Sequence, residues 1–232
     1  MIIERPGSAR GEGRADWLHS RHTFSFSHYY DPQWMGFGPL RVINEDVVAP
    51  GAGFAPHRHA NMEILSYVLD GELSHRDDSG GGGVIRTGEL QWMGAGHGIE
   101  HSEYNASPDR PVHFLQIWIQ PDRLNAKPGY AQREAPVEAG GWSLMASPDG
   151  AAGSLPIRQD AQLWLGRLDA GVQARHELVA TRRYWLHVAQ GRITVAGREL
   201  NAGDALGLVE ESLALAVEAV EPAQVLLFDL PL

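Results

Sequence analysis

Short apolar or alternating runs that end at turn residues make up most of this chain. Four such runs of five to seven residues lie in its first half, at 40–44, 63–69, 88–93 and 113–119. Runs of this length are typical of β-strands and are too brief for most helices. The segments between them are rich in Gly, Asp and Asn, which favour turns. The pattern predicts an all-β protein with a barrel or sandwich architecture and few short helices.

A weak internal repeat predicts two related β domains. The segment 68–73 resembles 188–193, and 86–90 resembles 201–205. Between the two halves, the stretch from 121 to 160 is rich in Pro, Gly, Ala and Ser and has little periodicity. We therefore predict an N-terminal domain with an N-terminal arm over 1–125, a linker over 126–160 and a C-terminal domain over 161–232.

Two pairs of metal-ligand residues lie some forty residues apart. His57 and His59 form the first pair and His101 and Glu103 the second, each with one residue between its members. Side chains at i and i+2 of a strand point to the same face, so each pair would present both groups together. Imidazole and carboxylate suit a divalent iron, copper, manganese or nickel ion, whereas structural zinc more often uses thiolate, and the chain has no cysteine.

Chance spacing is the alternative explanation for these pairs. The chain has 11 histidines, and a single His-x-His pair is more often a surface or hydrogen-bonded pair than a metal site. The repeat supplies a control, because it puts Arg175 and Glu177 at the positions of the first pair, and Ala216 and Glu218 at the positions of His101 and Glu103, so that all three histidines are missing. A domain of this type is thus expected to fold without the four ligands, which argues against a purely structural role for them.

Charge and composition indicate which kinds of partner the protein could bind. The formal net charge is -10 and no basic residues form a run, which argues against direct nucleic-acid binding because phosphate contacts need clustered Lys and Arg. The segment 1–6 lacks the pattern of a signal peptide, and no apolar run is long enough to span a bilayer. We expect a cytoplasmic protein with a small-molecule partner and no membrane association.

Longer motifs resemble the cupin superfamily and, within it, the pirin family. Gly51, the pair at 57–59, Glu63 and Gly71 resemble the first cupin motif, and the segment from Gly88 to His101 resembles the second. The finer resemblance to pirin is carried by HTFSF at 22–26, MEILSYVLDG at 62–71, LQWMGAG at 90–96 and GIEHSEY at 98–104. These motifs cover the first half of the chain densely and the second half loosely.

The resemblance implies a bicupin fold, in which two β-barrels of the jelly-roll or double-stranded β-helix type follow one another. It also implies one mononuclear divalent transition metal in the N-terminal barrel, held by His57, His59, His101 and Glu103. Fe(II) is favoured, and Cu, Mn, Ni, Co or Zn are possible. Most metal cupins use the carboxylate at the position of Glu63, which is therefore the rival ligand. We favour Glu103, because its spacing repeats that of the histidines, and expect Glu63 to support the ligands.

The resemblance extends to bacterial pirin-like quercetin 2,3-dioxygenases, which implies an enzyme. It would bind a flavonol through its 3-hydroxyl and neighbouring carbonyl, insert O2, open the ring and release carbon monoxide. Glu103 would be the catalytic residue, because it could take the hydroxyl proton as well as hold the ion. One alternative is a non-catalytic metal-binding regulator or redox sensor with a protein partner, and another is a metal-free cupin.

Other residues of interest have simpler expected roles. His97 is expected to be a solvent-facing turn residue, and His75 a satisfied strand histidine. We expect Asp77 and Asp78 to lie in a solvated hairpin loop and Phe54 to fill the barrel core.

Overall fold

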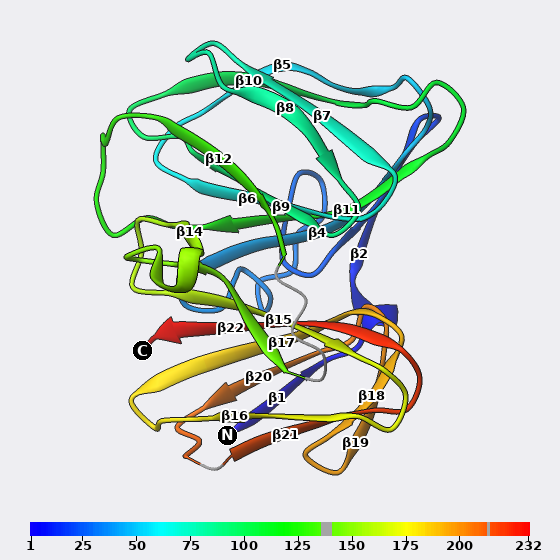
Figure 1. Ribbon diagram of the computed structural model, residues 1–232, viewed down its shortest axis with the longest axis vertical. Coiled ribbons are helices and arrows are strands. Elements are labelled where there is room, and N and C mark those ends of the chain that lie inside the picture. Colours follow the sequence, from blue (N-terminus) through cyan, green and yellow to red (C-terminus); the bar gives the residue numbers. More distant parts are fainter. Residues whose placement is uncertain (136–140, 213) are drawn as a thin grey trace. The chain divides into compact units, whose positions relative to one another are not determined.

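The computed structural model describes residues 1–135, 141–212 and 214–232, and it contains two compact units (Figure 1). The N-terminal unit consists of Gly11–Glu134 and Ile157–Gln159, and the C-terminal unit of Met1–Arg10, Ala135–Pro156 and Asp160–Leu232. The domain boundaries placed at 125, 126–160 and 161 stay predictions. Residues 136–140 of the expected linker lie outside the described residues.

The N-terminal unit is built from two antiparallel sheets. Its strands are β2 (Gly11–Ala15), β3 (Leu18–His22), β4 (Leu40–Val48), β5 (Gly53–His59), β6 (Glu63–Asp70), β7 (Glu72–Asp77), β8 (Gly82–Arg86), β9 (Glu89–Gly94), β10 (Ile99–Asn105), β11 (Val112–Ile119) and β12 (Gly129–Glu134). One sheet has the order β12-β9-β6-β11-β4-β3-β2 and the other β5-β10-β7-β8. The two sheets enclose the core of the unit (Figure 1).

The C-terminal unit repeats this plan. Its strands are β1 (Ile2–Arg5), β13 (Trp142–Ser147), β14 (Leu155–Pro156), β15 (Gln162–Leu168), β16 (Gln173–Glu177), β17 (Arg182–Gln190), β18 (Arg192–Val195), β19 (Arg198–Asn201), β20 (Ala205–Val209), β21 (Ala214–Ala219) and β22 (Ala223–Pro231). The sheet orders are β1-β20-β17-β22-β15-β13-β14 and β16-β21-β18-β19. The first strand of the chain, β1, thus pairs with β20.

The strand orders of the two units correspond. In the larger sheets β9-β6-β11-β4 matches β20-β17-β22-β15, and in the smaller sheets β5-β10-β7-β8 matches β16-β21-β18-β19. The only helices among the described residues are two 3-10 turns, Gly7–Ala9 and Ala151–Gly153, and no described helix could cross a bilayer. The predicted all-β fold of two related barrels is confirmed.

The same glycine turn joins equivalent strands in both units. Gly71, between β6 and β7, has a φ of +83°, and Gly191, between β17 and β18, has a φ of +78°. A Cβ added at Gly71 would lie 2.8 Å from the carbonyl oxygen of Pro111. Glycine is required here because it alone adopts this conformation without strain and leaves room for the neighbouring chain.

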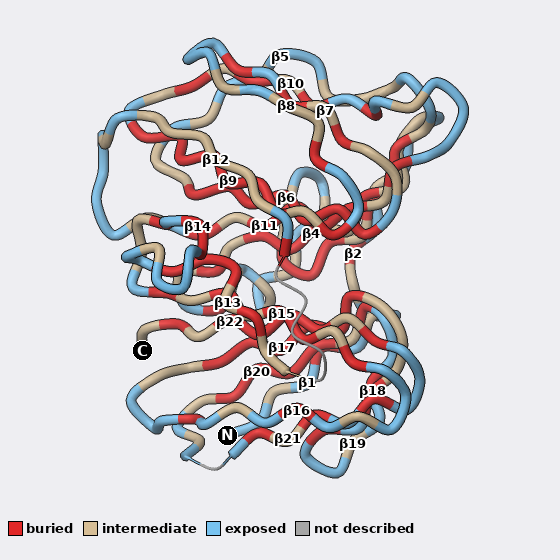
Figure 2. Tube along the Cα trace, viewed as in Figure 1, coloured by how far each residue is buried: buried red, intermediate tan, exposed pale blue. Residues whose placement is uncertain are grey.

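A polar layer divides the core of the N-terminal unit. Buried residues follow β4, β6, β9 and β11 (Figure 2), but Ser66 of β6 lies between Ile64 and Val68, which belong to separate apolar clusters. Ser66 pairs across the sheet with Gln116 of β11, and Gln116 pairs with Asn44 of β4. Cross-strand partners share a sheet face, so a row of polar groups crosses the barrel interior. The functional cavity opens beside this row.

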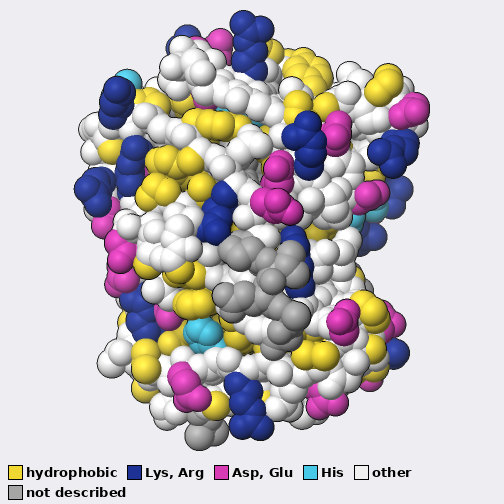
Figure 3. All heavy atoms as spheres, viewed as in Figure 1, with side chains coloured by type: hydrophobic (Ala, Val, Ile, Leu, Met, Phe, Trp, Pro, Cys, Tyr) yellow, Lys and Arg dark blue, Asp and Glu magenta, His cyan; other side chains and the backbone are white. Residues whose placement is uncertain are grey.

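Basic and acidic side chains are interspersed on the face of the molecule shown in Figure 3. No group of Lys and Arg dominates this face. The expectation that the protein does not bind nucleic acid directly stays a prediction.

Candidate metal centre

Strands β5 and β10 are neighbours, and their pairing places the two predicted ligand pairs together. His57 lies directly opposite His101, whereas Glu103 lies opposite Phe54. From Phe54 to His57 the chain advances three residues along β5, whereas from Glu103 to His101 it advances two along β10. This mismatch defines a β-bulge around Pro56. Proline cannot donate a ladder hydrogen bond, so it is tolerated at such a bulge. The bulge changes the phase of β5, and both Phe54 and His57 line the cavity.

The three predicted histidine ligands converge. The nearest ligand atoms of His57, His59 and His101 all lie within 4.8 Å of one another. Their ring centroids are 4.4 to 4.9 Å apart. His101 is buried, whereas His57 and His59 are partly exposed toward the cavity. The cluster thus has the spacing that one metal ion needs.

The electrostatics of the cluster favour neutral imidazoles. Burial and the neighbouring His57 lower the pKa of His59 to about 4. Burial, together with the nearby histidines, lowers the pKa of His101 to about 2. Nδ1 of His57 lies 2.8 Å from the carbonyl oxygen of Ala55, which can only accept, so Nδ1 donates and the Nε2 lone pair is left available. Neutral rings with available lone pairs are what metal ligation requires.

A buried chain of side chains orients His101. Nδ1 of His101 lies 3.3 Å from Nδ1 of His75, and Nε2 of His75 lies 3.1 Å from a carboxylate oxygen of Asp77. Burial alone would raise the pKa of Asp77, but hydrogen bonds from Ser79, His75 and Gly81 lower it. The ionised carboxylate accepts from Nε2–H of His75, so Nδ1 of His75 accepts from Nδ1–H of His101. The Nε2 lone pair of His101 is therefore free, and this buried atom has no hydrogen-bond partner among the described residues.

Glu103 is held from the opposite sheet. Its side chain is buried, with 1% of its surface exposed, and it accepts hydrogen bonds from Ser66 Oγ at 3.2 Å and Gln116 Nε2 at 2.8 Å. Burial raises the pKa of Glu103 to about 7, and the charge of Asp46 adds to this effect. One carboxylate oxygen of Glu103 and one ring nitrogen each of His101 and His75 lie within 4.8 Å of one another. Among the described residues, the four predicted ligands do not all meet this spacing as one set.

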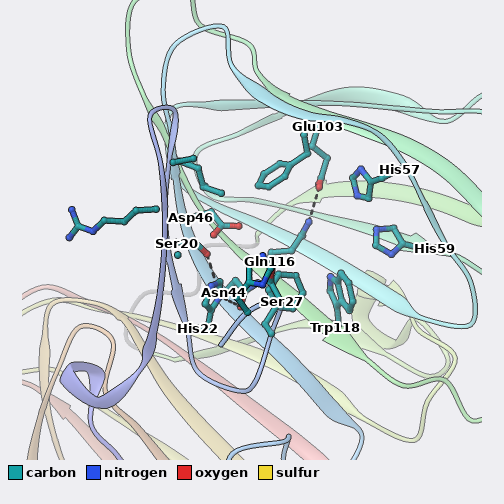
Figure 4. Close-up of a pocket in the computed structure, with 17 residues that line it drawn as sticks. Ser20, His22, Ser27, Asn44, Asp46, His57, His59, Glu103, Gln116 and Trp118 are labelled. Carbon is teal, nitrogen blue, oxygen red and sulfur yellow. Dashed lines mark hydrogen bonds between the residues drawn. The ribbon is translucent and has the colours of Figure 1, made fainter. Parts of the chain in front are cut away.

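A cavity of about 320 Å³ opens in front of these residues (Figure 4). His57, His59 and Glu103 line one side. Apolar walls are formed by Leu18, Phe26, Phe54 and Trp118, and a polar end by Ser20, His22, Asn44 and Asp46. The volume lies at the lower end of the range of small-molecule sites, about 300–1,000 Å³. The cavity is therefore suited to a small ligand.

The other residues singled out from the sequence have mixed outcomes. His97 is exposed in a turn, as expected. Glu63 accepts hydrogen bonds from Trp92 Nε1 at 2.7 Å and the Arg158 amide at 3.0 Å. Neither partner is one of the four predicted ligands, and the expectation that Glu63 supports the ligands stays a prediction.

The roles of Asp77 and His75 beside the histidine cluster were not predicted from the sequence. Asp77 is buried rather than part of a solvated loop, and His75 contacts His101 rather than serving only the core. The two residues are separated by one position, the same spacing as in both ligand pairs, and that signal could have identified them. Phe54 lines the cavity instead of only filling the core because the bulge reorients it.

Known proteins resemble this chain over its full length. The family profile described as Pirin matches residues 5–119, and the profile described as Quercetinase C-terminal cupin domain matches residues 144–230. A protein of Escherichia coli K12 named quercetin 2,3-dioxygenase is 44% identical over 231 residues, covering 100% of this chain and 99% of the relative. A pirin-like protein of Caulobacter vibrioides is 38% identical over 232 residues, covering 99% of each chain.

Solved structures show the same fold. The crystal structure of the bacterial pirin YhhW from Escherichia coli in complex with nickel(II) matches with a TM-score of 0.94 at 44% identity. The match covers 100% of this chain and 99% of that one. Sequence motifs, strand order, family profiles and full-length relatives agree, and the chain therefore belongs to the pirin family.

Proposed function

We propose that this protein is a metal-dependent dioxygenase that cleaves quercetin or a related flavonol with O2. The observation that carries the proposal is the convergence of His57, His59 and His101 at the wall of a cavity of about 320 Å³. The name of the Escherichia coli relative, quercetin 2,3-dioxygenase, supports the choice of reaction.

The side chains present fit a single divalent metal. The orphaned, buried Nε2 of His101 and the neutral state of the imidazoles are typical of a nitrogen ligand set. His57, His59 and His101 would hold the ion, with Glu103 as the fourth ligand. Nickel(II) in the related YhhW structure supports a divalent ion, and we propose Fe(II) as the favoured one in this chain. When bound, the ion would supply Lewis acidity and open positions for substrate and dioxygen.

The chain's own residues would position the flavonol and move its proton. Phe26, Phe54 and Trp118 would flank the aromatic rings and exclude water. Glu103, whose pKa is raised to about 7 by burial, would accept the proton of the 3-hydroxyl near neutral pH. Ser66 and Gln116 would keep its carboxyl in place. Overall, both oxygen atoms of O2 enter the products, two ring bonds break and one ring carbon leaves as carbon monoxide.

The test is turnover of quercetin by protein loaded separately with each candidate ion, under oxygen and under argon. We expect oxygen uptake and carbon monoxide release with at least one ion, and none under argon. Glu103→Gln should lower turnover by at least about 100-fold while metal analysis shows the ion retained. Glu218→Gln, an exposed glutamate on β21 of the C-terminal unit, is the control. Full metal content with full turnover in Glu103→Gln would exclude the base role.

A second candidate is a non-catalytic metal-binding protein with a protein partner. The Caulobacter relative carries the name pirin-like and not that of a dioxygenase, and this alternative rests on that difference. It predicts that the protein binds the ion but does not consume oxygen with quercetin. The same assay therefore separates the two candidates.

A further inference from the structure

The end of the cavity formed by β3 and β4 contains a polar group of its own. Ser20 pairs with Asp46 across the two strands, and His22 pairs with Asn44. Nδ1 of His22 lies 2.9 Å from Oδ1 of Asn44 and 3.4 Å from Oγ of Ser20. All four side chains line the cavity, and in Figure 4 they lie apart from His57 and His59. The proposed metal chemistry does not use any of them.

Asp46 is the unusual member of this group. Only 4% of its surface is exposed, and its Oδ1 has no hydrogen-bond partner among the described residues. A buried carboxyl oxygen without a partner is costly and normally indicates a bound water or ligand group. Burial raises the pKa of Asp46 to about 7, so both the acid and the carboxylate are populated near neutral pH. The group could therefore donate or accept a hydrogen bond.

Strand β4 itself does not need a carboxyl at this position. The preceding residue, Glu45, points to the opposite face of the strand, where it contacts His113 Nε2 at 2.9 Å. Asp46 instead faces the barrel interior, where apolar residues would fill the space at lower cost. Its burial is thus better explained by the cavity than by the sheet.

A second unpartnered polar atom belongs to Trp118, which lines the same cavity. Nε1 of Trp118 is buried and has no hydrogen-bond partner among the described residues. The Trp118 ring packs edge-on against His59, with centroids 5.0 Å apart. The other oxygen of Asp46 has a hydrogen bond with Ser20. One unpartnered donor and one unpartnered carboxyl oxygen, on residues of a cavity that Leu18, Phe26 and Phe54 also line, suit a ligand with polar groups at its edges.

We propose that Asp46 forms a subsite that binds a hydroxyl group of an aromatic ligand at the end of the cavity away from the three histidines. A phenolic hydroxyl fits because it donates and accepts hydrogen bonds, as Asp46 does. An anionic ligand group would be repelled by the carboxyls of Asp46 and Glu103. The direction in which the ligand lies rests on the proposed function, because that function places the 3-hydroxyl and carbonyl at the metal. Asp46 would then select ligands that carry further hydroxyls.

The experiment compares two flavonols in the purified, metal-containing protein under argon, where no turnover occurs. Quercetin carries hydroxyls remote from its 3-hydroxyl and carbonyl, whereas 3-hydroxyflavone has none. Binding is measured by quenching of tryptophan fluorescence. The wild-type protein should bind quercetin at least fivefold more tightly. Asp46→Leu should raise the Kd for quercetin about tenfold, the value of one hydrogen bond to a buried carboxyl, and change the Kd for 3-hydroxyflavone less than twofold.

Two further variants complete the design. Asp46→Asn keeps polar atoms at this position, and its Kd for quercetin should stay within about threefold of wild type. Glu45→Gln, one residue away on the outer face of β4, should change neither Kd. If Asp46→Leu does not fold, as judged by circular dichroism, Asp46→Ala replaces it, and the wild-type preference between the two flavonols still tests the proposal.

Several outcomes would overturn the subsite. In Asp46→Leu, the subsite is excluded if the Kd values of both flavonols rise equally or if neither rises. In the wild type, it is excluded if the two flavonols bind equally well or if neither binds. The outcome is independent of catalysis. If selective binding depends on Asp46 but quercetin is not consumed under oxygen, the proposed function fails and the subsite stands.

Discussion

At the scale of single residues, the tautomer of His101 depends on two side chains outside the predicted ligand set. His75 accepts the Nδ1 proton of His101 because Asp77 accepts the Nε2 proton of His75. Tyr130 stacks on His75 with a centroid separation of 4.9 Å and covers the pair. Without this chain, either nitrogen of His101 could carry the proton, and the molecules protonated at Nε2 would have no lone pair facing the cluster. His75 and Asp77 are thus positioning residues.

His75→Phe tests this role, because Phe keeps the ring that stacks on Tyr130 but removes the acceptor. We expect metal affinity to fall about 10- to 100-fold, the usual effect of removing such a partner. In the metal-free protein, ¹⁵N chemical shifts should show His101 changing from one tautomer to a mixture. His75→Gln, which restores an acceptor, should recover part of both properties, and His113→Phe, on the outer face of β11, should alter neither. An unchanged tautomer in His75→Phe would contradict the assignment.

At the scale of elements, strand positions could be read from the sequence, but their pairing could not. The predicted run at 40–44 lies within β4, 63–69 within β6, and the other two runs match β9 and β11 to within one residue. Alternation along a strand indicates which face of the sheet a side chain occupies, so the prediction that His57 and His59 share a face is correct. It carries no information on a bulge, which is why Phe54 was misassigned. It also carries none on long-range partners, such as β20 for β1.

The turn between β6 and β7 offers a test of the glycine requirement. Gly71 and Gly51 both have positive φ, but a Cβ at Gly71 would meet the Pro111 carbonyl at 2.8 Å, whereas Gly51 has nothing within 4 Å. Gly51→Ala should therefore lower the free energy of unfolding by only about 1 kcal/mol, from backbone strain alone. Gly71→Ala should lower it by roughly 2–4 kcal/mol, because strain and a steric clash add. Denaturant unfolding measures both variants, and equal losses would show that the clash is relieved without cost.

At the scale of the whole molecule, the two units share one strand arrangement but have different residues in their interiors. Where the N-terminal unit has Ser66 opposite Gln116, the C-terminal unit has Leu186 opposite Leu227. In the smaller sheets, His57 lies opposite His101, and at the equivalent place His176 lies opposite Leu215. The positive-φ turn glycines Gly51 and Gly171, and the matching backbone hydrogen bonds from Asn105 to Ala52 and from Ala219 to Val172, define this equivalence. The internal repeat put Arg175 and Ala216 at these positions, and that register is wrong. The polar row that holds Glu103 was not predicted, because its members come from separate strands whose pairing the sequence does not specify.

This asymmetry predicts that a metal ion stabilises one unit only. A ligand that binds only the folded state stabilises by about 4 kcal/mol at 1,000 times its Kd. Hydrogen exchange with and without a chelator should therefore show that chelation increases exchange in β5, β10 and β7 while β16, β21 and β18 stay unchanged.

Strand β1 makes the prediction specific. Although it begins the chain, its backbone hydrogen bonds are made with β20, so its exchange should follow the C-terminal unit and not respond to metal. Strands β2 and β3, only a few residues later, pair with β4 and should respond. His176→Ala, at the position of β16 equivalent to His57, should leave the metal effect intact, whereas His57→Ala should remove it. A metal effect of equal size in both units, or one that includes β1, would contradict the assignment of the ion to the histidine cluster, because only the N-terminal unit gains contacts when that cluster is filled.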